Sequence, residues 1–450
     1  MARYEFSDGK SNKFWEITQD DTVLTIVFGR IGTAGTLSTK VLPSAYSAKA
    51  EHDKLVAEKK KKGYKLATAE QAQSASKRTG SGGGPSVEEL EAGIIASPDD
   101  EPAWRQYGEA LKSAGDPRGE AVLLSIGSPP SKPPEAVTKL ATAHRKKWLG
   151  NLAQEGCTAK LEFTHGAFID TARISASYED EEGQSPDAQT RSLLRLESAK
   201  FLRALTIGLA DAEGDNDYAA VVTAIIKAGK RPSLRKLVIG DFEYPDESEI
   251  SWATIGDVGR ILPLMSNLEE MRVQGGKIII KTASHPTLRS LILHTGGLPG
   301  ITARGVASSK LPELLRLEMW LGTESYGGSA DIGALTPLFD GKGFPNLKEL
   351  GLMNSTFQNA IAKGIVGSKI LKQLDVLDLS MGTMNDEGGE AILAAKAKLA
   401  HLSKLNLENN YLSEKLAKKI KAALPNAQVG RQRTADMYGD EAHYYTAVGE

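Results

Sequence analysis

Histidine and cysteine are the residues of this 450-residue chain best suited to metal or nucleophilic chemistry. The single cysteine, Cys157, has no second cysteine with which to share a zinc ion, and no residue marks the base that a catalytic thiol needs. No two histidines stand four residues apart, the spacing of a helical zinc pair; they are His52, His144, His165, His285, His294, His401 and His443. We expect these histidines to lie at the surface or at helix caps.

The short motifs of common enzyme classes are also missing. The glycine-rich run Gly80–Pro85 lacks the Lys-Ser/Thr pair of a phosphate-binding loop. There is no nucleophile elbow, dinucleotide fingerprint or kinase motif set. We therefore predict a protein that is not an enzyme, with no catalytic residue, no metal and no cofactor.

Charge is divided unequally along the chain. Residues 1–79 hold 14 Lys and Arg against 9 Asp and Glu, a net of +5, whereas the remaining residues hold 41 against 48, a net of −7. A basic first part favours an anionic partner, either DNA or RNA. The four lysines Lys59, Lys60, Lys61 and Lys62 contribute most to this bias, although they read equally well as the solvated end of a helix.

Composition is ordinary for a soluble globular protein, with 40% apolar and 25% charged residues. No apolar run approaches the 18 residues of a membrane span, and the first residues show no apolar core of a secretory signal. We therefore expect a cytoplasmic protein that has no membrane partner.

Three modules, a linker and a tail follow from the patterning. Residues 1–66 predict a small α+β domain, because alternating apolar stretches precede a charged helix that starts near Ser47 and ends at Gly63. Residues 67–86 predict a flexible Gly/Ser linker. Residues 87–155 predict a helical domain that opens on the capping-box pattern Ser86-Val87-Glu88-Glu89.

Residues 156–429 are dominated by a repeat of the form Leu-x-x-Leu-x-Leu. Its eight copies begin at Leu202, Leu234, Leu268, Leu288, Leu314, Leu347, Leu374 and Leu402, and Leu161-Glu162-Phe163 reads as a degenerate opening copy. Helices are predicted between strands at 218–227, 255–265, 390–398 and 414–423. A strand and a helix repeating at this period predict an α/β solenoid with a parallel inner sheet and outer helices.

The first 66 residues resemble the WGR domain. The matching residues are Lys13-Phe14-Trp15-Glu16, Phe28-Gly29-Arg30-Ile31-Gly32 with Gly35, and Lys62-Gly63-Tyr64. In poly(ADP-ribose) polymerases this domain binds DNA at breaks. The resemblance implies nucleic-acid contacts at Phe28, Gly29, Arg30 and Lys40, with Phe28 standing where the family has tryptophan.

Two further resemblances cover the rest of the chain. Residues 87–125 resemble a short bacterial domain that accompanies repeat proteins, through Tyr107-Gly108-Glu109 and Gly115-Asp116-Pro117-Arg118-Gly119-Glu120. The repeats resemble the ribonuclease-inhibitor-like class of leucine-rich repeats. Neither resemblance implies a reaction.

The inner sheet is the best candidate surface for a partner. Residues on either side of the second leucine of each copy point out of the sheet. The candidates there, with one tryptophan just beyond, are Lys236, Glu270, Arg272, Arg316, Glu318, Trp320, Glu349, Asp378, Lys404 and Asn406. This mixture of both signs does not suit a phosphate backbone, so we expect a protein partner.

Residues 430–450 carry Tyr438, Tyr444 and Tyr445 among polar residues. They predict either a docked cap on the solenoid or a free tail that binds a partner. The function predicted from the whole sequence is that of a bacterial adaptor whose repeats bind a protein and whose first domain binds nucleic acid or a second protein. The alternative is a DNA-binding or DNA-damage module led by residues 1–79.

Overall fold

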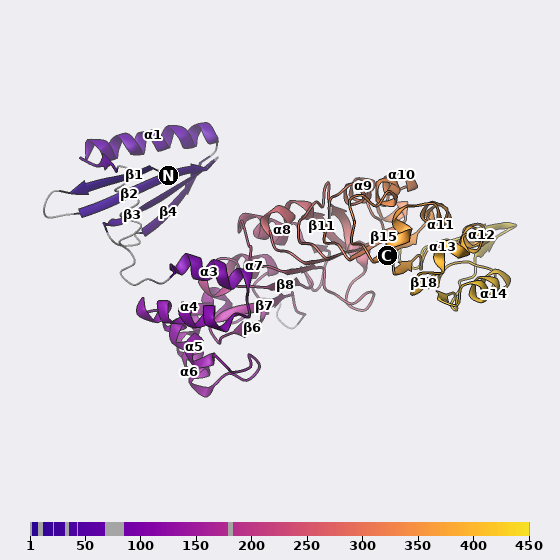
Figure 1. Cartoon of the computed structure of the whole chain (residues 1–450), viewed down its shortest axis with the longest axis horizontal. Coiled ribbons are helices and arrows are strands. Elements are labelled where there is room, and N and C mark those ends of the chain that lie inside the picture. The colour runs from indigo at the N-terminus through magenta and orange to yellow at the C-terminus, as the bar shows by residue number, and fades with distance from the viewer. Residues whose placement is uncertain are drawn as a thin grey trace. The chain divides into compact units, whose positions relative to one another are not determined.

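The computed structural model describes residues 2–7, 12–20, 22–31, 36–42, 44–67, 85–178 and 183–449. These residues form two compact units, Met1–Leu90 and Glu91–Glu450, each of which is described by itself (Figure 1). Gly32, Gly35 and most of the predicted linker, residues 68–84, lie outside the described residues. No helix among the described residues is both long and apolar enough to cross a bilayer.

The first unit is an antiparallel sheet with one helix on one face. Its strand order is β4-β3-β2-β1-β5, with β1 (Ala2–Ser7), β2 (Asn12–Asp20), β3 (Val23–Arg30), β4 (Thr36–Val41) and β5 (Lys65–Leu66). Helix α1 (Ala45–Lys61) begins at Ser44, whose hydroxyl accepts the Ser47 backbone N–H, and carries its lysines at the carbonyl end, where cations are stabilised. Alternate strand residues face α1 and bury Tyr4, Trp15, Ile17 and Leu24.

Four helices open the second part of the chain: α3 (Val87–Ala96), α4 (Glu101–Ser113), α5 (Pro117–Ser125) and α6 (Glu135–Leu149). Helices α4 and α5 approach each other through glycines. A Cβ on Gly119 would lie 2.4 Å from the backbone nitrogen of Lys112 and 2.5 Å from the carbonyl oxygen of Gly108. The glycines of the sequence motif therefore serve close helix packing.

The repeats form a sheet in the order β19-β18-β17-β16-β15-β14-β12-β10-β8-β7-β6. The strands, in chain order, are β6 (Lys160–Thr164), β7 (Phe168–Ile174), β8 (Ala204–Ile207), β10 (Lys236–Ile239), β12 (Glu270–Gln274), β14 (Ser290–His294), β15 (Arg316–Gly322), β16 (Glu349–Ser355), β17 (Val376–Asp378), β18 (Lys404–Asn406) and β19 (Ala427–Gln428). The second leucine of one copy pairs with that of the next, as Leu291 does with Leu317, and both are buried. The predicted α/β solenoid is confirmed.

The predicted first copy of the repeat, Leu161-Glu162-Phe163, is not part of the parallel stack. Strand β6, which contains Leu161-Glu162-Phe163, pairs antiparallel with β7 in a hairpin, and it is β7 that pairs in parallel with β8. The parallel stack therefore begins at Phe168, because the tight turn at residues 165–167 leaves no room for a crossover connection between β6 and β7.

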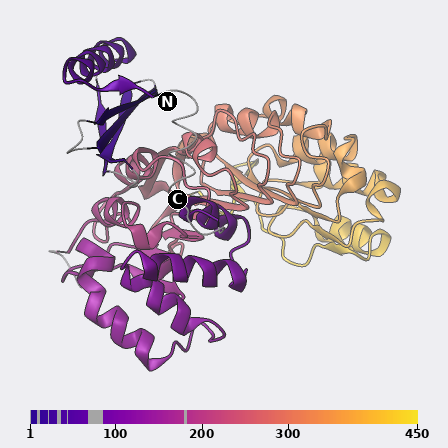
Figure 2. The ribbon, with the colours of Figure 1, turned by 60° about the vertical axis from the view of Figure 1, so that its left-hand side comes forward.

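Helices cover the outer side of the sheet (Figure 2). They are α7 (Pro186–Leu193), α8 (Ala219–Lys227), α9 (Gly300–Ala307), α10 (Ile332–Phe339), α11 (Gln358–Val366), α12 (Asp386–Ala394), α13 (Lys396–Leu399) and α14 (Glu414–Ala423). The helix predicted at 255–265 is wrong: β11 (Ala253–Asp257) and two 3-10 turns occupy it. Strand β11 lies between β9 (Asn216–Asp217) and β13 (Gly276–Ile279) in a second parallel sheet. Gly256, at φ 88, and Pro263 both oppose a helix there.

The chain turns back after the last repeat. A hairpin of β20 (Asp436–Tyr438) and β21 (Glu441–His443) follows β19, and residues 444–449 then return along the repeats, so that the C-terminal end lies near β15 (Figure 1). Val448 at this end is buried in the same core as the repeat leucines.

Candidate functional site

A basic groove of about 640 Å³ lies at one end of the helix-covered face of the first unit. It is lined by Asn12, Lys13, Phe14, Phe28, Gly29, Arg30, Lys59 and Tyr64. The register between β2 and β3 brings these residues together. Lys13 pairs with Arg30 and Trp15 with Phe28, and residues opposite each other on neighbouring strands share a face. The last turn of α1 brings Lys59 to the same place.

The groove is cationic and aromatic. The Lys59 Nζ lies 5.3 Å from the Trp15 ring centre and 5.0 Å from that of Tyr64. Burial lowers the pKa of Lys59, and the nearby charges of Lys62 and Lys13 lower it further. None of the lining residues that the structure describes is acidic, and Phe28 is 44% exposed beside them. An anion that entered the groove would relieve repulsion among the cations.

The structure gathers only part of the nucleic-acid set predicted from the sequence. Phe28, Gly29, Arg30 and Lys59 line the basic groove, whereas Lys60, Lys61 and Lys62 are exposed at the end of α1. Lys40 lies elsewhere: it pairs with Leu24, six residues before Arg30 on β3, or about 20 Å along the strand. Its Nζ contacts the Glu51 carboxylate at 2.6 Å.

The sequence prediction missed four groove residues, which are Asn12, Lys13, Phe14 and Tyr64. Lys13 precedes Trp15 by two positions, so strand alternation alone would have placed it on the same face. Tyr64 follows the helix and comes close through the turn at Gly63, whose φ is 88.

The sheet face opposite the outer helices, which we call the concave face, carries charges that pair with one another across strands. Lys236 contacts Glu270 at 3.0 Å, and Arg316 contacts Glu349 at 3.8 Å. Further pairs along the same face are Arg272 with Asp241 at 3.6 Å and Asp378 with Asn406 at 2.8 Å. Lys404 lies in the same row as Lys236, on β18. Charges of both signs therefore lie side by side along this face.

Glu318 is the centre of this face. One of its oxygens accepts from His294 Nε2 at 2.7 Å and from Trp320 Nε1 at 3.3 Å, and the other accepts from Arg316 at 2.7 Å. Burial alone would raise the pKa of Glu318, but the bonds from His294 and Arg316 hold it at about 2. The imidazole of His294 stacks on the Trp320 indole, with ring centres 4.1 Å apart.

His294 was not among the predicted partner residues. It stands two positions beyond Ile292 on β14 and so faces the same way, in the row that continues to Trp320. We name His294, Arg316, Glu318 and Trp320 the aromatic platform. Both oxygens of Glu318 are hydrogen-bonded and the two rings stack, so these four side chains form one connected group.

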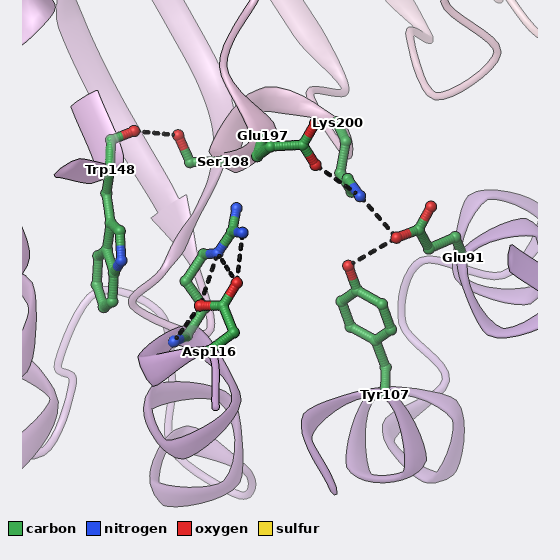
Figure 3. Close-up of polar contacts among 8 residues, drawn as sticks. Glu91, Tyr107, Asp116, Trp148, Glu197, Ser198 and Lys200 are labelled. Atoms are coloured by element: carbon green, nitrogen blue, oxygen red, sulfur yellow. Dashed lines mark hydrogen bonds and ion pairs between the residues drawn. The ribbon is translucent and has the colours of Figure 1, made fainter. Parts of the chain in front are cut away.

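A polar network joins the opening helices to the first repeat (Figure 3). The Tyr107 hydroxyl donates to Glu91 at 2.9 Å, and Lys200 bridges Glu91 at 2.6 Å and Glu197 at 2.9 Å. Burial and the Glu91 charge raise the pKa of Tyr107 above its usual range, so the hydroxyl keeps its proton. Every member has a partner, which indicates a structural junction.

Two side chains that could act as nucleophiles, Ser125 and Cys157, are already engaged in contacts with other residues. The Ser125 hydroxyl donates to the Val122 carbonyl at 2.8 Å, so the contact at 3.1 Å with His165 Nδ1 leaves the imidazole as donor and activates no nucleophile. Cys157 lies 3.5 Å from the Gln189 amide oxygen. Across the described residues, no three His, Cys, Asp or Glu side chains gather as a metal site.

Comparison with known proteins identifies the first module. Residues 1–71 match the WGR domain family. "Uncharacterized protein YfeS" of Escherichia coli K12 is 39% identical over 62 residues, which are 14% of this chain and only 25% of that protein. A crystal structure of a Bacteroides fragilis protein is similar over 99% of both chains, at 25% identity and a TM-score of 0.53. An internalin structure from Listeria monocytogenes covers 55% of this chain and is covered over 71% of its own, at 16% identity and a TM-score of 0.25.

Proposed function

We propose that this chain is a non-catalytic adaptor that binds nucleic acid in its basic groove and a protein partner on its concave face. The observation that carries the proposal is the convergence of Lys13, Arg30 and Lys59 around the exposed Phe28, with no acidic side chain among the described lining residues. The match of residues 1–71 to the WGR domain supports it.

The groove suits an unstacked nucleotide. Cations that neutralise phosphates release counterions, and an exposed aromatic ring offers a stacking surface to any base. Bases inside a duplex are already stacked, whereas those at a nick, an end or a single strand are accessible. Phe28 has a smaller ring than tryptophan and no N–H, so we expect it to stack without a hydrogen bond.

The Arg30→Gln, Lys59→Gln double variant of the full chain is expected to bind DNA about tenfold more weakly, with a salt slope lower by about 2, because two phosphate contacts are removed. Fluorescence anisotropy with labelled nicked, blunt and single-stranded DNA at several salt concentrations measures both quantities. Circular dichroism checks that the variant keeps its fold.

Lys40→Gln is the matched control, since it removes a lysine of the same domain that is held by Glu51 away from the groove. We expect its affinity and salt slope to equal those of the unmodified chain. Absence of binding by the unmodified chain at low salt, or an equal loss in the Lys40 variant, would contradict a nucleic-acid site in the groove.

A protein partner on the concave face is supported by the aromatic platform. Trp320 and His294 form a flat stacked surface in the middle of the sheet, and aromatic side chains recur at interface hot spots. Because the surrounding charges are paired with one another, long-range attraction is weak there. We propose that the partner is selected by shape and short-range contacts.

Trp320→Ala is expected to weaken capture of this partner by about 2 kcal/mol, or roughly thirtyfold. The measurement is affinity capture by the full chain from nuclease-treated lysate, followed by titration of the protein recovered. Trp252→Ala is the control, because Trp252 is 59% exposed and precedes β11, outside the main sheet. A partner lost equally from both variants would show that the platform is not its binding site.

A further inference from the structure

The returning end of the chain lies on a surface that the sequence did not reveal. Residues 444–449 run across the ends of the five neighbouring strands β18, β17, β16, β15 and β14, against the order of the repeats. They pass Tyr411 first, then Met381 and Asn354, and reach Gly296 last. We name this surface the edge groove.

The edge groove binds its occupant through hydrogen bonds to the occupant's backbone N–H and C=O groups. The Tyr411 hydroxyl accepts from the Tyr445 N–H and donates to the Tyr445 carbonyl, both at 3.0 Å. The Met381 carbonyl accepts from Ala447 N–H at 2.9 Å. Asn354 contacts both sides of Val448, accepting from its N–H at 2.9 Å and donating to its carbonyl at 2.6 Å.

Close packing restricts which side chains the occupant can carry at two positions, Val448 and Gly449. Val448 is only 6% exposed and belongs to the hydrophobic core of the repeats. A Cβ on Gly449 would lie 2.9 Å from a ring carbon of Tyr326, so a side chain there requires that ring to move. The Gly449 carbonyl oxygen lies 2.1 Å from where a Cβ of Gly296 would be, so glycine is needed at position 296.

Asn354 shows that the groove is built around a peptide. Its side chain is fully buried, its backbone φ is 51, and among the described residues its two side-chain hydrogen bonds both go to Val448. Without an occupant this amide would exchange those partners for water, and each hydrogen bond to Val448 contributes a net of about 0.5–1.5 kcal/mol over that exchange. The same amide offers a donor and an acceptor to the main chain of any extended segment.

We propose that the edge groove is a peptide-binding site for an extended segment of another protein that carries a small residue followed by Val-Gly. Residues 444–449 are its resident occupant. They are tethered through the hairpin of β20 and β21, and a short tether of this kind supplies an effective concentration on the order of 1 mM. The partner's segment must therefore compete with the chain's own, which makes the tail a gate on the site.

The test uses a fluorescent peptide with the sequence of residues 441–449 and the full chain in two forms. One is the unmodified chain, and the other carries Val448→Asp and Gly449→Val, which disable its own occupant. We expect saturable binding of the peptide to the disabled chain and about tenfold weaker binding to the unmodified chain, because the tether competes. Adding Asn354→Ala to the disabled chain should abolish binding.

A peptide that carries Gly449→Val is the matched control and should not bind either form. If the disabled chain loses its fold, hydrogen exchange on the unmodified chain replaces it: excess peptide should speed exchange of the amides of Ala447 and Val448. No saturable binding to a folded disabled chain up to about 1 mM, equal binding of both peptides, or exchange that excess peptide leaves unchanged would overturn the proposal.

Discussion

Replacement of Trp104 by alanine is expected to lower the free energy of unfolding of the second unit by about 3–5 kcal/mol. Trp104 is 2% exposed and comes from α4. Its ring centre lies 4.9 Å from that of Phe201, 5.7 Å from that of Phe168 and 4.4 Å from that of His165. The alanine would leave a cavity among rings that belong to both the opening helices and the first repeats.

Loss of one hydrogen bond adds to this cost. The indole Nε1 of Trp104 donates to the Pro98 carbonyl at 2.7 Å, and the variant removes that donor. Urea unfolding followed by circular dichroism measures the change, with Trp252→Ala as the exposed tryptophan control, for which we expect less than about 0.5 kcal/mol. Equal small effects in both variants would show that the opening helices are not packed on the repeats as described.

The second large effect is expected at Asp116. Its carboxylate accepts the backbone N–H of Arg118 at 3.0 Å, which starts α5, and it also pairs with the Arg118 guanidinium. Asp116→Ala removes the helix cap and leaves a mostly buried cation without its partner, so we expect a loss of about 2–4 kcal/mol. Asp116→Asn keeps a cap and should lose less.

The pH dependence separates these two contributions. Burial alone would raise the pKa of Asp116, but the bonds from Arg118 bring it below its ordinary value. A carboxyl group whose folded pKa is depressed stabilises the fold above its unfolded pKa, and this stabilisation is lost as pH falls through the folded value. The difference between the unmodified chain and Asp116→Asn in urea should therefore shrink below about pH 4. A difference that stays constant with pH would contradict the ion pair.

The repeat region shows how far sequence alone reaches. Burial of Leu237 or Leu317 follows from a pattern that recurs along the chain, and stacked copies are the fold that buries it. The helix prediction for residues 255–265 failed because Gly256 and Pro263 oppose a helix there. Pairing of β11 with β9 and β13 makes the first part of the segment a strand instead. Strand pairing between distant segments leaves little local trace.

The candidate sites likewise contain some residues that the sequence identifies and some features that require the structure. Phe28, Arg30 and Trp320 were found from residue type and motif, and strand alternation could have added Lys13 and His294. The separation of Lys40 from Arg30 required the strand register, because two residues of one domain can lie at opposite ends of the same sheet.

The small first domain, the solenoid and the uneven division of charge follow from the amino-acid order, because periodic burial, turn residues and composition act over short stretches. The position of Lys59 over the strand end and the stacking of His294 on Trp320 depend on how distant segments pack in the folded chain. The same holds for the return of residues 444–449 to Asn354, some 90 positions earlier. Such contacts join residues far apart in the chain, and their energy depends on distance and orientation in the folded state.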